Sequence, residues 1–267
     1  MNLLDATSLR VDRFGTSPPG LLVLDEQDAL WEGQPLWHIL KLNRATNPIP
    51  TVVLVEPTSG VPNVAGIEIE ADVYLPKPVE SNRFHQAVED CCVGLSRTRE
   101  RGIVWQLKIS LRSACEYLEQ AVTLLRSMWF MKRFSADEAR RFALAIQEMG
   151  MNAIEWGNRK RLEKLAWMTF VVDSEKVVAH IRDSGPGFDR QKLPHAADRD
   201  DPVRHMTIRE EIGIREGGFG ILMTQGLVDD LQYNDTGNEV RLTKRFSRTE
   251  NDGTLFAVKE SSTHFGL

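Results

Sequence analysis

Residues 147–153 read Gln-Glu-Met-Gly-Met-Asn-Ala and lie within a long helical pattern. Ser135 precedes this pattern, and the acidic residues that follow it favour a capped helix start. Apolar residues then recur at three- and four-residue steps and predict one buried stripe, formed by Phe142, Ile146, Met149, Ala153 and Trp156. Glu148 and Asn152 are four positions apart, so they share a helix face beside the stripe. Their oxygens suit Mg²⁺, although an ordinary solvated helix face fits the same pattern.

Two glycine-containing segments follow. Residues 183–188 read Asp-Ser-Gly-Pro-Gly-Phe after an alternating, strand-like run, and residues 216–220 read Glu-Gly-Gly-Phe-Gly before an apolar helix. A carboxylate followed by glycines can accept a hydrogen bond from the adenine amine and leave room for the flat ring. Glycine-rich backbone at a helix start suits phosphate. A simple turn and a helix-entry loop are the alternatives, and neither a P-loop nor a dinucleotide fingerprint is present.

Taken in this order, the three segments resemble the N, G1 and G2 boxes of the GHKL ATPase superfamily, and most of all those of anti-sigma-factor serine kinases. The resemblance spans roughly residues 105–247 and implies an α/β sandwich of the histidine-kinase ATPase type that binds ATP and Mg²⁺. Residues 190–215, which are rich in charge and have little apolar pattern, resemble the ATP lid; a solvated surface loop is the alternative. The resemblance further implies one role for each matching residue: Glu148 as general base, Asn152 as the Mg²⁺ ligand, Asp183 with Gly185 and Gly187 at adenine, and Gly218 with Gly220 at the phosphates.

The N-terminal third has a different pattern. Strands are predicted at residues 21–25, 49–55 and 70–79, with helices at 29–43 and from 81 to about 95, which indicates a parallel sheet. The run ending in Lys77-Pro78 resembles the last strand of a flavodoxin-like receiver domain, and Asp25 falls at the phosphoacceptor position. The likeness is incomplete, because few residues precede Asp25 and Glu56 stands where a Ser or Thr is usual. Asp25, with Lys77, is a candidate phosphoacceptor; a degenerate receiver used for docking is the alternative.

The predicted organisation is a truncated receiver-like domain at 1–97, a linker at 98–104 that either ends or continues the preceding helix, a kinase domain at 105–247 and a tail at 248–267. Residues 105–131 are predicted to form a helix, either in the core or at a homodimer contact. The net charge of −5 gives no reason to expect nucleic-acid binding. Three cysteines without metal-ligand spacing and the lack of a 20-residue apolar run favour a cytoplasmic protein that does not cross a membrane.

Three functions compete at this point. The first is a protein serine/threonine kinase whose partners are anti-anti-sigma or sigma-factor-like regulators. The second is a phosphorelay histidine kinase of a two-component system, with a response regulator as partner, but residues 105–131 contain no histidine and His85 lies in the N-terminal third. The third is a non-catalytic switch in which ATP only controls the affinity for a partner protein.

Overall fold

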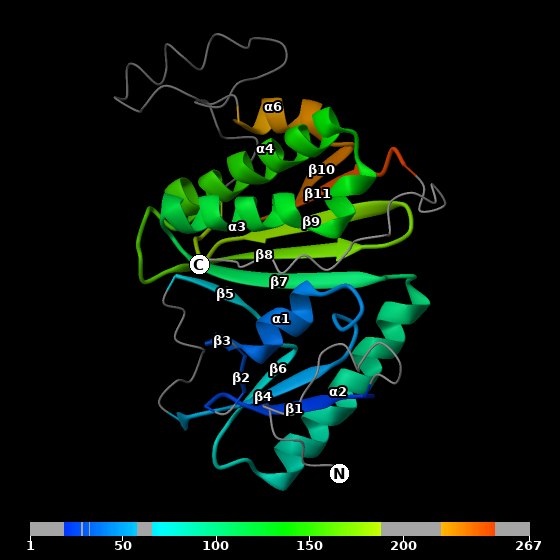
Figure 1. The fold of residues 1–267 in the computed structure, drawn as a ribbon. Helices are drawn as coiled ribbons and strands as arrows, with labels where there is room; N and C mark the ends of the chain where they lie inside the picture. Colours follow the sequence, from blue (N-terminus) through cyan, green and yellow to red (C-terminus); the bar gives the residue numbers. More distant parts are fainter. Residues whose placement is uncertain (1–18, 28, 32, 58–65, 188–219, 249–267) are drawn as a thin grey trace.

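A computed structural model of the chain describes residues 19–27, 29–31, 33–57, 66–187 and 220–248. The described strands form a six-stranded sheet in the order β10-β11-β9-β8-β7-β5, a three-stranded sheet in the order β1-β4-β6, and a two-stranded hairpin. Figure 1 shows the two larger sheets in separate halves of the molecule, with α1 lying between them. The predicted lid at 190–215 and the predicted phosphate-binding Gly218 lie outside the described residues.

The six-stranded sheet is antiparallel throughout. Along β8, residues that are almost fully buried alternate with partly exposed ones, because successive side chains of a strand point to opposite faces. One face therefore belongs to the core and the other is partly open. The strands of this sheet are β5 (Ile67–Ile69), β7 (Trp105–Arg112), β8 (Leu165–Val172), β9 (Lys176–Arg182), β10 (Asp230–Tyr233) and β11 (Glu239–Arg245).

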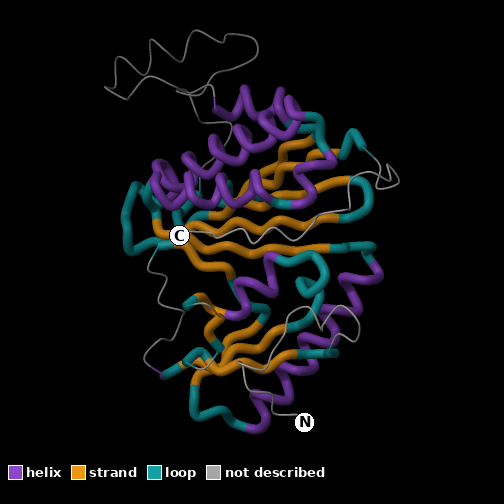
Figure 2. The backbone as a smooth tube through the Cα atoms, in the orientation of Figure 1, coloured by secondary structure: helices purple, strands orange, loops and turns teal. Residues whose placement is uncertain are grey.

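Helices cover the buried face of this sheet, as Figures 1 and 2 show. They are α3 (Cys115–Ser127), the 3₁₀ helix η4 (Trp129–Arg133), α4 (Ala136–Asn152) and α6 (Gly220–Leu227). Ser135 caps the start of helix α4 as predicted, and Ser135 and Glu138 form a reciprocal capping box. Hydrogen bonds from Ser135 lower the pKa of Glu138 to about 2, so the Glu138 carboxylate of the capping box is ionised at neutral pH. The predicted stripe residues Phe142, Ile146 and Met149 pack in the main core.

The helix predicted for residues 105–131 is wrong for its first third. Residues Trp105–Arg112 form strand β7, and the helix α3 begins only at Cys115. Trp105, Leu107, Ile109 and Leu111 alternate with more polar residues, and this two-residue period governs the segment. The helical spacing of Leu118, Val122 and Leu125 is real, and all three are buried in α3.

The smaller sheet is parallel, as the alternation of strands and helices predicted. Its strands are β1 (Leu22–Asp25), β4 (Thr51–Val55) and β6 (Val73–Pro76). Helix α1 (Leu36–Leu42) packs on one face, and helix α2 (Ser81–Glu100) packs on the other. Helix α2 continues past the predicted end at Leu95 and through the start of the predicted linker. The limits of the two domains themselves stay a prediction.

The helix predicted for residues 29–43 is also wrong in its first half. The chain instead forms a hairpin of β2 (Leu30–Trp31) and β3 (Gln34–Pro35), and α1 begins after Pro35. Gly33 has a φ of 82°, which glycine adopts without steric cost. Pro35 lacks the N–H that a helix interior requires, so the helix starts immediately after it.

The two halves are joined by hydrogen bonds and by a shared strand. Strand β5 comes from the N-terminal third but pairs with β7 of the six-stranded sheet. Its Glu68 accepts hydrogen bonds from Trp37 (3.2 Å) and pairs with His38 (2.8 Å) of α1. The Asn47 side chain bonds both the N–H (2.9 Å) and the carbonyl (2.7 Å) of Gln106, so it pairs with β7 as a strand residue would. Among the described residues, none of the helices has the length and apolar character needed to span a membrane.

Candidate nucleotide-binding site

Glu148 and Asn152 lie on the last two turns of α4, both partly exposed on the same side of the helix. The first residue of α6, Gly220, lies against them. A Cβ atom at Gly220 would be 3.1 Å from Oε2 of Glu148 and 3.7 Å from Nδ2 of Asn152. The start of α6 therefore approaches the two polar groups that the sequence predicted for the site. Free N–H groups at a helix start favour an anion at this place.

The helix changes its geometry immediately after Asn152. Residues Ala153–Gly157 form one π turn, in which the N–H of Asn158 donates to the carbonyl of Ala153 at 2.8 Å. The wider turn rotates the following residues away from the α-helical stripe. Trp156, predicted to continue that stripe, is therefore 47% exposed, which corrects the prediction. Ala153 remains buried as expected.

The turn after β9 packs against the end of this π turn. A Cβ atom at Gly157 would overlap the carboxyl group of Asp183, so glycine is required there for Asp183 to approach. The N–H of Gly185 donates to Oδ1 of Asp183 at 2.7 Å. Gly187 has a φ of 77° and lies against the backbone of Thr236, which no side chain would permit. The structure thus brings Asp183, Gly185 and Gly187 together in one tight turn beside the N-box helix.

The environment of Asp183 departs from that of a surface carboxylate. Burial raises the pKa of its carboxyl group, and the hydrogen bond from Gly185 only partly offsets this effect. The backbone N–H of Asp183 donates to the carbonyl of Asn238 at 3.0 Å, which fixes the turn against the β10–β11 connection. A half-buried carboxyl group with a remaining acceptor site suits a single hydrogen-bond donor such as an aromatic amine.

Asn158 is a positioning residue that the sequence analysis did not identify. Its side chain is fully buried and bonds three partners: the N–H of Ser184 (2.8 Å), the carbonyl of Leu165 (2.9 Å) and Oγ of Ser113 (2.8 Å). Asn158 therefore holds the turn that contains Asp183 against the end of helix α4 and its π turn. The sequence offered one signal, an asparagine directly after the helical pattern. Its burial and its hydrogen-bond partners could not be predicted, because the partners are distant in sequence.

We expect Asn158→Ala to lower the free energy of unfolding by about 2–3 kcal/mol, because it leaves several buried polar groups without partners. Chemical denaturation measures this change. Asn43→Ala is the matched control, since Asn43 makes one exposed turn hydrogen bond to the N–H of Ala45, at 2.8 Å. A denaturation midpoint for Asn158→Ala equal to that of the control would contradict the positioning role.

The donor set fits Mg-ATP. Within the described ranges there is no group of three or more His, Cys, Asp or Glu side chains that could hold a metal ion. The Asn152 carboxamide and the nearby Glu148 carboxylate, on the side of α4 that Gly220 approaches, are the oxygen-bearing groups that could hold Mg²⁺. Mg²⁺ accepts such a site because it keeps several waters and takes further oxygens from phosphates.

A second polar cluster lies at the carboxyl edge of the parallel sheet. Lys77 donates to Asp25 (2.9 Å) and to Glu56 (2.9 Å), and these three residues follow or end strands β6, β1 and β4. The hydrogen bond from Lys77 lowers the pKa of Asp25, and the two carboxylates raise the pKa of Lys77. Glu56 thus shares the Lys77 ammonium with Asp25. Phosphorylation of Asp25 stays a prediction.

The larger half of the molecule is an antiparallel sheet covered on one face by helices, with Glu148, Asn152 and Gly220 close together at the end of α4. A family model for the histidine kinase-like ATPase domain matches residues 111–244, about half of the chain, and the chain belongs to this family. No curated protein matches the sequence. A histidine kinase domain from a blue-light-activated histidine kinase of Erythrobacter litoralis is similar at 14% identity and a TM-score of 0.30, covering 60% of this chain and 73% of that chain.

Proposed function

We propose that the chain is an Mg-ATP-dependent protein serine/threonine kinase of the anti-sigma type, which phosphorylates or sequesters a regulatory protein. The observation that carries the proposal is the meeting of three predicted site residues. Gly220 at the start of α6 lies so close to both side chains that a Cβ atom there would be 3.1 Å from Oε2 of Glu148 and 3.7 Å from Nδ2 of Asn152. A carboxylate, a carboxamide and a helix start thus lie side by side, and this arrangement supports the roles proposed for them.

Each residue has one chemical role in this proposal. Glu148 accepts the proton of the partner's hydroxyl group as the hydroxyl oxygen bonds the terminal phosphorus and ADP leaves. Asn152 holds Mg²⁺, which neutralises phosphate charge when it is bound. Asp183 accepts a hydrogen bond from the adenine amine, and Gly185 and Gly187 keep the space beside it open. Gly220, with Gly218, lies at the phosphates.

The proposed partners are anti-anti-sigma or sigma-factor-like regulators, or a response regulator. Autophosphorylation on a histidine, as in a histidine kinase, is disfavoured. Such a kinase needs an acceptor histidine on a helix before the ATP site, and residues 105–131, which include α3, contain no histidine. The parallel sheet with α1 and α2 is proposed to be an incomplete receiver used as a docking or regulatory module. Its attachment through β5 and Asn47 gives it a direct connection to the ATPase sheet.

The proposal is tested by incubating the full chain with terminally labelled ATP, Mg²⁺ and the proteins that copurify with it. We expect label on a partner that survives acid treatment, as phosphoserine and phosphothreonine do, whereas phosphohistidine does not. Calorimetry on the same sample measures ATP binding with and without Mg²⁺. ATP binding without any acid-stable transfer would favour the non-catalytic switch, and no heat of binding in the presence of Mg²⁺ would refute the ATP site itself.

A further inference from the structure

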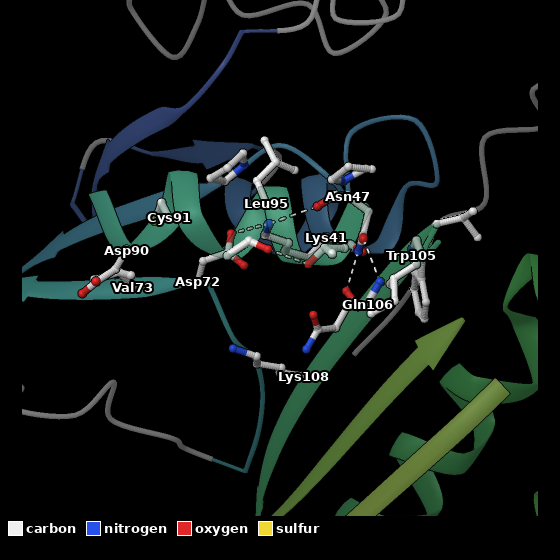
Figure 3. Close-up of a pocket in the computed structure, with 16 residues that line it drawn as sticks. Lys41, Asn47, Asp72, Val73, Asp90, Cys91, Leu95, Trp105, Gln106 and Lys108 are labelled. Carbon is white, nitrogen blue, oxygen red and sulfur yellow. Dashed lines mark hydrogen bonds and ion pairs between the residues drawn. The ribbon is translucent and has the colours of Figure 1, made fainter. Parts of the chain in front are cut away.

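A cavity of about 290 Å³ lies at the junction of the two halves, away from the nucleotide site. One wall is helix α2, contributing Leu95, and the loop before β4, contributing Pro50. The other wall is the start of β7, contributing Gln106 and Lys108. Figure 3 shows the side chains of Gln106 and Lys108 extending from β7 toward the region of Asp72. The volume is near the lower end of the range for ligand pockets, roughly 300 Å³, which suits a small metabolite.

Asp72, which lines this cavity, is held in a fixed orientation by several hydrogen bonds. The buried ammonium of Lys41 donates to the carbonyls of Asn47 (3.1 Å) and Ile49 (2.9 Å) and to Oδ2 of Asp72 (2.5 Å). The N–H of Thr51 also donates to Oδ2 of Asp72, at 2.8 Å. Within the described part of the chain, the second carboxylate oxygen, Oδ1, takes no hydrogen bond. Since the Asp72 side chain is 39% exposed, this oxygen is available to a ligand with a positive group.

Lys108 provides the opposite charge on the facing wall. It lies on the side of β7 that faces the N-terminal half, because Trp105, Leu107 and Ile109 alternate with it and fill the core. Glu70 is a neighbouring acid. Burial raises its pKa above the usual value, and the charge of Lys108 partly offsets this effect. Lys108 is partly exposed. An anionic ligand group near Lys108 would gain a charge-assisted hydrogen bond, and the Gln106 carboxamide would add a neutral one.

We propose that this cavity is a binding site for a small zwitterion of the amino-acid class. The ammonium group of the ligand pairs with Asp72, its carboxylate pairs with Lys108, and a short apolar side chain packs against Leu95 and Pro50. Asp90 adds a second carboxylate to the lining, so a ligand with an anionic group alone is disfavoured. Asp72 and Lys108 belong to different halves of the chain. A ligand that bonds both therefore holds the N-terminal half against the ATPase sheet.

The test is calorimetric titration of the full chain with each of the twenty amino acids at millimolar concentration, and with acetate and ethylamine as single-charge probes. We expect at least one amino acid to bind and both single-charge probes to bind more weakly. Lys108→Met should lower the affinity for that amino acid by about tenfold or more, as expected for the loss of one charge-assisted hydrogen bond. Lys108→Glu should weaken it further.

Lys176→Met is the matched control, because Lys176 is a partly exposed lysine on β9 of the same sheet and lies outside the cavity. The control should bind the amino acid as the wild type does, and Lys108→Met and Lys176→Met should both keep the thermal unfolding temperature and the ATP affinity of the wild type. The proposal is overturned if no amino acid binds, if acetate or ethylamine binds as tightly, or if Lys108→Met binds normally. None of these outcomes depends on the kinase proposal.

Discussion

Glu148→Gln is expected to reduce phosphoryl transfer to a partner by about 10²–10⁴-fold, the usual contribution of a general base. Glutamine keeps the size and the hydrogen-bonding oxygen of the side chain but cannot accept the hydroxyl proton. Because Asp183 and Asn152 are untouched, we expect the affinity for Mg-ATP to change little. Single-turnover transfer of labelled phosphate, measured beside calorimetric ATP binding, separates the two quantities.

Glu119→Gln is a suitable control, since Glu119 is an exposed residue of the neighbouring helix α3. This variant should transfer phosphate at the wild-type rate. Normal transfer by Glu148→Gln would remove Glu148 from the catalytic role. Loss of ATP binding in the same variant would instead indicate that Glu148 acts mainly in binding Mg²⁺ or phosphate.

Asp183→Asn is expected to weaken ATP binding by about ten- to a hundredfold, the effect of losing a charged acceptor for one hydrogen bond. The same substitution should not lower the stability of the fold and is expected to raise it at neutral pH. Burial raises the pKa of Asp183 above its usual value near 3.8, so the folded chain disfavours the ionised form. The wild type therefore loses stability as the pH rises from that value through the raised pKa, whereas the asparagine variant does not. At neutral pH the variant should unfold at the same temperature as the wild type or at a higher one.

Asp173→Asn serves as the control for this experiment. Asp173 is at the opposite end of β9 and also accepts backbone hydrogen bonds, from Glu175 (2.7 Å) and Lys176 (2.8 Å), which an asparagine oxygen can retain. It should leave ATP affinity unchanged. An unaltered ATP affinity in Asp183→Asn would show that the adenine amine bonds elsewhere, and a lower unfolding temperature would show that ionised Asp183 stabilises the turn.

Local patterns predicted the elements around the site well. The capped start of α4, the strand before Asp183 and the helix after Gly220 are all present, because caps, strand alternation and glycine turns are fixed by neighbouring residues. The segment from Trp105 was mispredicted because its apolar residues satisfy a two-residue period and merge into a true helix at Cys115. Pairing with β8, more than fifty residues later, and with β5 stabilises the strand that the two-residue period favours.

The supports of the site could not be predicted from sequence, because they are contacts between distant residues. Asn158 reaches Ser113, Leu165 and Ser184, and Gly157 matters only because Asp183 packs upon it. The π turn likewise displaces Trp156 from the stripe that helical periodicity assigned to it. Motif spacing indicates which residues meet a ligand, whereas tertiary packing determines what holds them in place.

Strand β5 has a practical consequence for anyone who wishes to dissect the chain. It is encoded upstream of α2 yet forms the outer strand beside β7. A fragment excised near residue 98 would carry the family motifs intact but would present β7 with part of its backbone unpaired. Bare sheet edges recruit other polypeptides. Expression of the ATPase half by itself is thus expected to promote self-association through the exposed edge of β7.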